Sequence, residues 1–535
     1  MFGAATSAYQ IEGAWNFGDK SESIWDRLLH TYPSIVFDKS NGDEACFSAD
    51  FWTRDIEIAH ELGLQMYRLV CSKQLSSEQV LLLSDLLSKI TTTMSTKSFA
   101  QCRAKFNGER CYNKVEEFVT SISVFKKIEK ISDDDALEGL SLVLTDKAAT
   151  FSISWPRVLP TGFPNKISQY GKSYYSKLID GLLKKGIQPV VTMYHWDLPQ
   201  SLQDLGGWTN PLIATWFADY ARVLYSLFGD RVKYWITINE PLTICDGGYN
   251  KMAAPFLNDM KISNYLCSKH VLLAHAKAFR IYDEEFRKAH RGKISLANIF
   301  FWFEPENAIK DTKATQLTMQ LWEGRFGHPV YSKSGGWPPE LEKHMAVLSA
   351  KEGYRQSRLP PFTPEEINLI KGTYDFYALN HYTTRLVRAV PPKVADPWPY
   401  YGSKELGVSF VNHPSRRTIV IDWFQVYPEG LRKQLHWIKD NYEVKDIMIT
   451  ENGLPSLRDS LTDYDRLDYI RENLKQVLLA INEGVNVMGY TVWSLIDSFE
   501  WITGYQYNPY RLRTARESAL YYKSVIQNRT ILNMD

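Results

Sequence analysis

The stretch Ile447-Met-Ile-Thr-Glu-Asn-Gly-Leu-Pro455 decides the fold. Its first four residues are apolar or β-branched, which is typical of a short buried strand. The Asn-Gly pair that follows is a turn signal, and the proline ends the segment. Glu451 is therefore a carboxylate at the C-terminal end of a buried strand. Parallel α/β barrels place their catalytic groups at such strand ends.

A second stretch, Val232-Lys-Tyr-Trp-Ile-Thr-Ile-Asn-Glu-Pro241, has the same form. Aromatic and β-branched residues predict a strand, and the strand ends at Glu240 before a proline. One such glutamate alone is better explained as a solvated turn residue. Two of them in matching contexts predict a pair of carboxylates that face one pocket.

The motifs Thr237-Ile-Asn-Glu-Pro241 and Ile449-Thr-Glu-Asn-Gly453 resemble the acid/base and nucleophile motifs of glycoside hydrolase family 1, the retaining β-glucosidases. The resemblance covers residues 2–68 and 151–531. It implies an α/β fold, a (β/α)8 TIM barrel, with Glu240 as acid/base and Glu451 as nucleophile. The implied reaction is hydrolysis of β-D-glucosides by double displacement, with β-galactosides and β-fucosides as further substrates. It implies no cofactor and no metal.

Such a reaction needs two carboxyl groups whose pKa values are pushed apart. We expect the pKa of Glu240 to be raised to about 6, so that the group is protonated at the first step. Glu451 is expected to be ionised. The family geometry implies carboxyl groups about 5–5.5 Å apart.

Further site residues follow from the resemblance, position by position. The residues that match the sugar-binding set are Gln10, His195, Asn239, Glu500 and Trp501, with Trp493 as the platform under the sugar. Tyr382 matches the tyrosine that hydrogen-bonds the nucleophile. Asn380 and Arg68 match residues that support the nucleophile, and Arg68 is expected to be its charge partner.

The whole chain sets further bounds. It has 535 residues and 61.8 kDa, enough for one large barrel. The formal net charge of +1 does not favour a nucleic-acid partner, and no apolar run approaches the roughly 18–20 residues of a membrane span. The expected partner is a small-molecule β-glycoside, and the oligomeric state is open. The six cysteines are too few and too scattered to predict a disulfide scaffold.

Strand and helix patterns alternate along most of the chain, which predicts a parallel α/β architecture. We expect strands at 2–12, 187–194, 232–240, 293–303, 373–382, 447–451 and 487–495. We expect helices at 51–62, 170–185, 212–228, 268–290, 431–442 and 467–483. His270 and His275 lie on the helix expected at 268–290. Because they are five positions apart, they do not share a helix face, and they are interpreted as packing residues.

Residues 69–150 interrupt this pattern. The block contains no tryptophan and no proline, although the chain has 16 and 24, and it holds three of the six cysteines. It is expected to be mostly helical, and residues 106–149 resemble a fragment of a retrotransposon gag capsid domain. The predicted organisation is a barrel formed by residues 1–68 and 151–535, with residues 69–150 as an insertion of foreign composition in strand two.

Two completions of strand two are open. In the first, Leu69-Val70-Cys71 completes the strand and the block leaves afterwards. In the second, Ala148–Trp155 forms the strand, which separates Arg68 from it and removes a positive charge from beside Glu451.

The region after Tyr505 differs from the family pattern, and the cellular location is open. After Gly504-Tyr505 the family has about ten further residues, including a phenylalanine near the sugar's primary hydroxyl, that this chain lacks. No signal peptide is visible before the first expected strand, and both an extracellular and a cytoplasmic location are open. The alternatives to a β-glucosidase are a non-catalytic glycan-binding relative and a non-functional chimera of a β-glucosidase gene.

Overall fold

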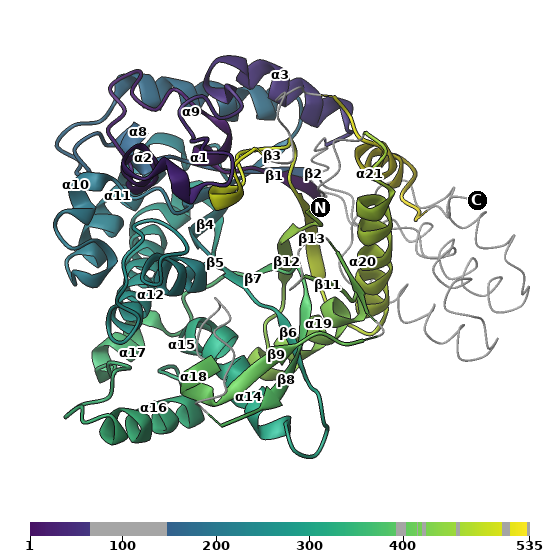
Figure 1. Cartoon of the computed structure of the whole chain (residues 1–535). Helices are drawn as coiled ribbons and strands as arrows, with labels where there is room; N and C mark the ends of the chain where they lie inside the picture. The colour runs from purple at the N-terminus through teal and green to yellow at the C-terminus, as the bar shows by residue number, and fades with distance from the viewer. Residues whose placement is uncertain are drawn as a thin grey trace, which may run out of the picture.

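The computed structural model describes residues 1–64, 147–391, 403–414, 416–419, 424–455, 461–505 and 514–531. Within them, eight parallel strands close into a barrel in the order β1-β13-β12-β7-β5-β4-β3-β2 (Figure 1). The barrel strands are β1 (Phe2–Ala5), β2 (Lys147–Ser152), β3 (Gln188–Tyr194), β4 (Tyr234–Asn239), β5 (Lys293–Ile299), β7 (Tyr377–Asn380), β12 (Ile447–Asn452) and β13 (Val487–Trp493). The predicted (β/α)8 barrel is confirmed.

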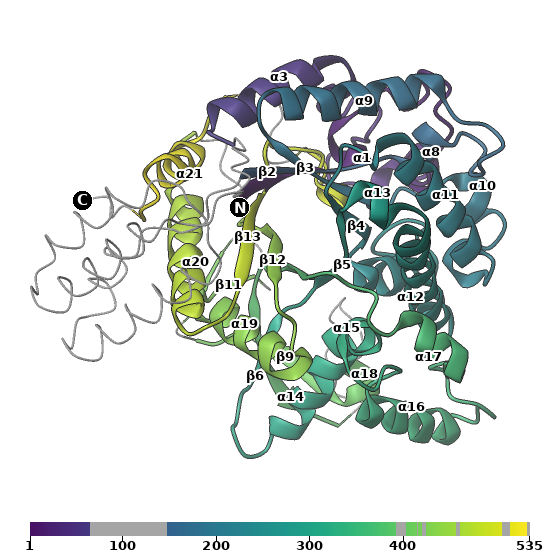
Figure 2. The same cartoon turned by 180° about the vertical axis from the view of Figure 1, so that it is seen from behind.

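Helices surround the barrel in both views of the molecule (Figures 1 and 2). The α-helices are α1 (Ala8–Ile11), α2 (Ile24–Thr31), α3 (Ser48–Glu61), α8 (Trp155–Val158), α9 (Gln169–Lys184), α10 (Gln200–Gln203), α11 (Ile213–Phe228), α12 (Ser263–Ile281), α13 (Arg287–His290), α14 (Thr312–Met319), α15 (Arg325–Tyr331), α16 (Pro339–Lys351), α17 (Pro364–Ile370), α18 (Ser403–Leu406), α19 (Glu429–Tyr442), α20 (Tyr464–Asn482) and α21 (Glu517–Asn528).

Shorter elements complete the fold. The 3₁₀ turns are η1 (Pro33–Ile35), η2 (Gly207–Thr209) and η6 (Trp501–Thr503), and the π-helical turns are η3 (Thr243–Gly247), η4 (Tyr282–Phe286) and η5 (Gln320–Gly324). Outside the barrel lie a three-stranded sheet of β6 (Trp302–Pro305), β8 (Thr384–Ala389) and β9 (Val408–Val411), and a two-stranded sheet of β10 (Arg417–Thr418) and β11 (Gln425–Val426).

The barrel strands are buried on both faces, which explains their near-continuous apolar runs. One face packs on the helices. The other face fills the barrel interior with a separate cluster of side chains: Met1, Val190, Ile236, Ala297, Phe376, Ala378 and Met448. The barrel interior is therefore a packed core, and a reaction can take place only at the C-terminal ends of the strands.

Three expected elements are divided differently in the structure. The strand predicted at 2–12 is β1 followed by α1, so Gln10 lies on a short helix. The chain leaves the barrel after Ala5, which is the last residue of β1 paired with both neighbours. The strand at 293–303 is β5 and β6, because Trp302 pairs with Thr384 in the outer sheet. The helix at 268–290 is α12 and α13, separated by η4.

Strand two is formed by residues on the C-terminal side of the interruption. β2 pairs with β1 through Phe2↔Lys147 to Ala5↔Thr150, and with β3 through Ala148↔Gln188 to Ser152↔Thr192. Of the two completions, the structure has the second. Leu69-Val70-Cys71, Arg68 and the helices expected inside the block lie outside the described residues. The boundary at 150/151 falls within β2, and the division into barrel and insertion stays a prediction.

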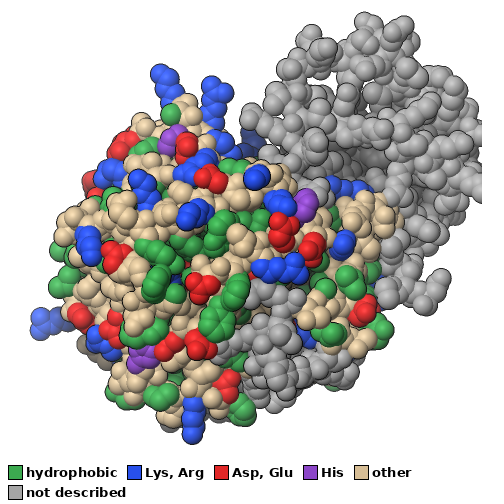
Figure 3. Space-filling model, turned by 90° about the horizontal axis from the view of Figure 1, so that it is seen from above, with side chains coloured by type: hydrophobic (Ala, Val, Ile, Leu, Met, Phe, Trp, Pro, Cys, Tyr) green, Lys and Arg blue, Asp and Glu red, His purple; other side chains and the backbone are tan. Residues whose placement is uncertain are grey.

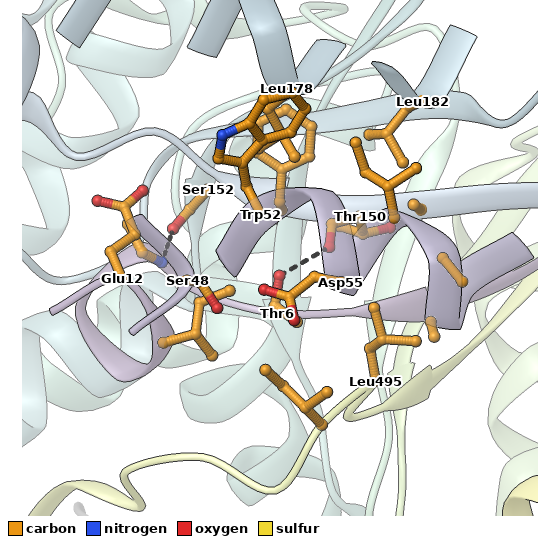
Figure 4. A pocket seen from close by; sticks show the side chains of 18 of the residues that line it. Thr6, Glu12, Ser48, Trp52, Asp55, Thr150, Ser152, Leu178, Leu182 and Leu495 are labelled. Atoms are coloured by element: carbon orange, nitrogen blue, oxygen red, sulfur yellow. Dashed lines mark hydrogen bonds between the residues drawn. The ribbon is translucent and has the colours of Figure 1, made fainter. Parts of the chain in front are cut away.

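Buried polar contacts join the two sides of this interruption. The Arg157 Nε donates to Glu12 Oε2 at 2.7 Å, and the Tyr175 hydroxyl donates to Glu12 Oε1 at 2.6 Å. The Ala8 amide donates to Ser152 Oγ at 2.6 Å. Beside these contacts lies a cavity of about 50 Å³ between α3, α9 and the β1–β2 pair (Figure 4).

One disulfide joins Cys245 in η3 to Cys267 in α12, 22 positions apart in the sequence. The scattered cysteines of the sequence did not predict this bridge. Its two cysteines belong to different elements and come together only when α12 packs beside the loop after β4.

The surface does not carry one dominant charge on the face shown in Figure 3, where acidic and basic side chains are interspersed over the described residues. Of the helices that the structure describes, none has the length and apolar character of a membrane span.

We expect Arg157→Met to lower the apparent free energy of unfolding by about 3–5 kcal/mol, because it leaves the Glu12 carboxylate buried without its cation. Arg157 is fully buried and Glu12 nearly so. Urea unfolding followed by tryptophan fluorescence measures the change. The exposed pair Lys333–Glu443 provides the control, since Lys333→Met should leave the midpoint unchanged. An Arg157→Met midpoint equal to that of Lys333→Met would show that the pair does not hold β1 and β2 together.

Candidate active site

The predicted site residues other than Arg68 meet at the C-terminal end of the barrel. They lie at or just after the ends of the barrel strands, or in the segments that follow them: Gln10 in α1, His195 after β3, Asn239 and Glu240 at β4, Asn380 and Tyr382 at β7, Glu451 in β12, Trp493 in β13, Glu500 just before η6 and Trp501 as its first residue. Arg68 lies outside the described residues.

Glu240 is held by two neutral hydrogen-bond donors. The Asn380 Nδ2 donates to Glu240 Oε1 at 2.8 Å, and the Thr243 hydroxyl donates to Oε2 at 2.9 Å. The side chain is 4% exposed. Its backbone has φ of 51°, in the left-handed region that glutamate rarely adopts. The orientation of this carboxylate is therefore accompanied by local backbone strain.

Glu451 Oε2 accepts a hydrogen bond from the Tyr382 hydroxyl at 2.6 Å. Its backbone carbonyl accepts from the His381 amide at 3.0 Å, which fixes the strand end beside β7. Asn380 lies between the two glutamates. Its Nδ2 contacts Glu240, and its Oδ1 accepts from Thr450, the residue before Glu451, at 2.7 Å. The charge of Glu240 acts on Glu451, so the two carboxyl groups are neighbours. Their expected separation of about 5–5.5 Å stays a prediction.

Burial raises the pKa of both glutamates. The pKa of Glu240 rises to about 7, above the value of about 6 expected from the sequence, although Asn380 and Thr243 oppose the rise. Burial and the neighbouring charge of Glu240 raise the pKa of Glu451 well above its ordinary value, and the Tyr382 hydroxyl only partly offsets this. Neither carboxylate makes an ion pair with a described residue. An ionised Glu451 was expected, and its burial and the charge of Glu240 work against it. Arg68, the expected charge partner, lies outside the described residues, so its effect on Glu451 stays a prediction.

Polar groups gather at the far side of the space around Glu500. Its Oε1 accepts from Gln10 Nε2 and from Trp493 Nε1, each at 3.3 Å. Burial raises the pKa of Glu500 to about 7. An amide, a carboxyl group and an indole N–H converge here, which suits the adjacent hydroxyls of a sugar.

Aromatic rings form the remaining wall. The His195 ring stacks at 5.7 Å from Trp493 and at 6.1 Å from Trp501. Burial lowers the pKa of His195 to about 3, so its imidazole is neutral. The Asn239 amide contacts its Nε2 at 3.2 Å. Flat apolar faces beside polar groups match the two sides of a pyranose ring.

Comparison with known proteins agrees with this geometry. The sequence model of Glycosyl hydrolase family 1 matches residues 1–74 and 133–531. The chain belongs to glycosyl hydrolase family 1. The unmatched residues, 75–132, lie inside the predicted insertion.

The similar proteins of the family match over nearly the whole chain. Myrosinase 1 of Brevicoryne brassicae is 38% identical over 539 residues, which cover 98% of this chain and 97% of the relative. The cytosolic beta-glucosidase of Homo sapiens is 33% identical over 98% of this chain and 96% of the relative. The solved structure of an aphid myrosinase has a TM-score of 0.80 at 37% identity, with 98% of each chain covered. This family 1 chain is therefore a glycosidase.

Trp196 and Thr243 contribute to this family 1 site, although neither was predicted as a site residue from the sequence. Trp196 has φ of 74°, its ring contacts that of Trp501 in a tilted arrangement with the ring centres 4.6 Å apart, and its Nε1 donates to the Asn239 carbonyl at 3.0 Å. Trp501 also has a left-handed φ, of 50°. Thr243 is three positions after Glu240, a spacing at which side chains meet in a helical turn, so its role could have been predicted.

The two histidines of α12 are packing residues, as predicted. His275 contacts the Thr237 hydroxyl and the Thr373 carbonyl, each at 2.7 Å, and burial lowers its pKa to about 4. His270 contacts the Trp208 carbonyl at 2.9 Å.

We expect Tyr382→Phe to move the acid limb of the pH–rate profile to higher pH. The lost donor stabilises the ionised form of Glu451, and a hydrogen bond to a charged group is worth about 1.5–3 kcal/mol, or about 1–2 pH units. Measuring kcat/KM against pH for an aryl β-glucoside tests this. Tyr442→Phe is the matched control, since Tyr442 donates to the buried Glu323 away from the site at 2.5 Å. Equal profiles for the two variants would contradict the assigned contact.

Proposed function

We propose that the chain is a retaining β-glucosidase in which Glu240 is the acid/base and Glu451 is the nucleophile. The observation that carries this proposal is the pair of buried carboxylates at the ends of β4 and β12, linked through Asn380. Two carboxyl groups in one buried space are what glycoside hydrolysis requires.

In the first step, a Glu451 oxygen attacks the anomeric carbon while the bond to the leaving oxygen breaks. Glu240 gives its proton to that oxygen, and the alcohol leaves. A glycosyl ester on Glu451 remains. In the second step, Glu240 takes a proton from a water molecule whose oxygen attacks the anomeric carbon and releases Glu451. Two displacements give net retention.

The glucose unit would lie between the Trp493 and Trp501 rings and the Gln10–Glu500 pair. Gln10 and Glu500 are buried and already oriented by each other, so they offer a fixed donor and acceptor to neighbouring hydroxyls. Glu500 also disfavours a phosphorylated sugar, because a carboxylate repels a phosphate.

Oxygen-linked glycosides are the proposed substrates. An alkoxide leaving group needs a proton, and Glu240 can supply one. A sulfur-linked glycoside leaves as a thiolate without that help, so it gives a useful comparison. The non-catalytic alternative is disfavoured by the two carboxyl groups, which a glycan-binding protein would not need to retain together.

The purified chain is expected to hydrolyse 4-nitrophenyl β-D-glucoside and to release β-glucose first, as proton NMR can follow. Glu451→Gln should lower kcat by at least about 10³-fold, because it removes the nucleophile. Glu323→Gln is the control, a buried glutamate outside the site that should retain activity. Release of α-glucose first, or equal activity of Glu451→Gln and Glu323→Gln, would reject the proposal.

The charge balance around Glu451 depends on β2. Thr150 pairs with Val190, and Val190 belongs to the cluster inside the barrel, so the Thr150 side chain also faces inward. Its hydroxyl oxygen makes no hydrogen bond within the described part of the chain. On the adjacent β1, the residue paired with Thr150 is the small Ala5.

Deletion of residues 69–150 joins Arg68 to Phe151 and so puts an arginine at the position of Thr150. We expect this deletion and Thr150→Arg to shift the acid limb of kcat/KM to lower pH by about one unit or more, because a nearby cation stabilises the ionised Glu451. Activity at pH 5–6 should rise accordingly.

Thr150→Met is the control for this comparison, since it adds length without charge. A shift of similar size in Thr150→Met, or none in the two arginine-bearing proteins, would show that position 150 does not set the charge of the nucleophile.

A further inference from the structure

The turn that follows Glu240 carries one of its two hydrogen-bond donors. Pro241 and Leu242 lead into η3, whose first residue is Thr243. The Thr243 hydroxyl donates to Glu240 Oε2, while Asn380 from β7 donates to Oε1. The Ile244 amide also donates to the Glu240 carbonyl at 3.2 Å. The position of η3 therefore determines one side of the acid/base carboxyl group.

A disulfide ties η3 to the outer helix α12. Cys245 lies two residues after Thr243, and its partner Cys267 lies in the first half of α12. Both cysteines are fully buried. A covalent link this close to Thr243 limits any movement of η3 away from α12.

A buried ion pair ties the next residue of η3 to α15. The Asp246 carboxylate accepts hydrogen bonds from Arg325 Nη1 at 2.9 Å and Nη2 at 2.6 Å. It also accepts one from Asn264 Nδ2 of α12 at 3.3 Å. Arg325 is 0% and Asp246 is 1% exposed. The guanidinium also lies 4.9 Å from the ring centre of Phe326. A bidentate pair fixes orientation as well as distance, so η3 is held from a second direction.

Few other charges face these groups. Glu451 from β12 and the Tyr382 hydroxyl from the segment after β7 face Glu240. Around Asp246, the side of α12 contributes Tyr265. Arg325 and Arg358 lie 5.6 Å and 5.9 Å from the centre of that ring, and Arg358 pairs with Glu352 and Glu405. The ion pair itself is shielded from solvent.

We propose that Cys245–Cys267 and Asp246–Arg325 form a two-point clamp that holds Thr243 against Glu240 and thereby fixes the acid/base carboxyl group for proton transfer. The cysteines, Asp246 and Arg325 are positioning residues, since they act through Thr243. This inference rests on the proposed role of Glu240 as acid/base.

The clamp should matter only where the leaving oxygen needs a proton. Hydrolysis of phenyl β-D-glucoside needs strong acid assistance, because phenoxide is a poor leaving group. Hydrolysis of 2,4-dinitrophenyl β-D-glucoside needs little. If the Glu240 carboxyl group is no longer correctly oriented, kcat/KM should therefore fall more for phenyl β-D-glucoside than for 2,4-dinitrophenyl β-D-glucoside.

The test compares the full chain with Thr243→Val, Thr243→Ser and Cys245→Ala/Cys267→Ala, after thiol titration has established the bridge in the unaltered protein. In Thr243→Val and the double cysteine variant we expect the ratio of the two kcat/KM values to change by about tenfold or more. The basic limb should move to higher pH, because the lost donor no longer stabilises ionised Glu240. Thr243→Ser, which keeps the hydroxyl, should restore the ratio to within about twofold.

Leu474→Ala in α20 is the matched control, a fully buried side chain on another part of the barrel. It should lower stability without changing the ratio. A ratio in the cysteine variant equal to that of Leu474→Ala would overturn the clamp. Glu240→Gln distinguishes the two proposals: it must itself change the ratio strongly, and if it does not, the assignment of Glu240 fails rather than the clamp.

Discussion

The closure of the barrel at β1 is the constraint on which the rest of the structure depends. β1 is only four residues long, and it pairs with β13 on one side and β2 on the other. Without both pairings the sheet would have two open edges. The Glu12–Arg157 pair and the contact between Ala8 and Ser152 lie directly above this seam. They bring Gln10 to Glu500, so the sugar-binding side of the site depends on the same seam.

The site combines strict geometry with an unfavourable electrostatic arrangement. Three residues around it, Trp196, Glu240 and Trp501, have left-handed backbones, and such strain persists only where the surrounding packing enforces it. The carboxyl groups meanwhile share only neutral donors among the described residues. Burial then favours their protonated forms, which suits an acid and opposes a nucleophile. The proposed roles of Glu240 and Glu451 therefore require different surroundings, and the described surroundings favour the first role.

Much of this fold and site could be predicted because the informative signals are local. Strands that end in a glutamate, a turn and a proline identify Glu240 and Glu451 without any tertiary information. The predictions failed where tertiary contacts decide the structure. Gln10 lies in a helix because β1 loses its partners after Ala5. Cys245 and Cys267 meet because α12 packs beside η3. The raised pKa of Glu451 comes from its burial and from the nearby charge of Glu240, and both depend on the packed barrel rather than on a motif.

Strand pairing and catalysis depend on different parts of β2. Pairing uses backbone amides and carbonyls, so Lys147–Ser152 can close the barrel whatever its side chains are. Catalysis depends on the side chain that points inward at one position, and a threonine there offers no charge to a carboxylate across the barrel. A segment can therefore supply the strand pairing that closes a barrel without supplying a charge to the site. In this protein the fold is the more tolerant property, and the ionisation of Glu451 is the stricter test of whether the interruption is compatible with catalysis.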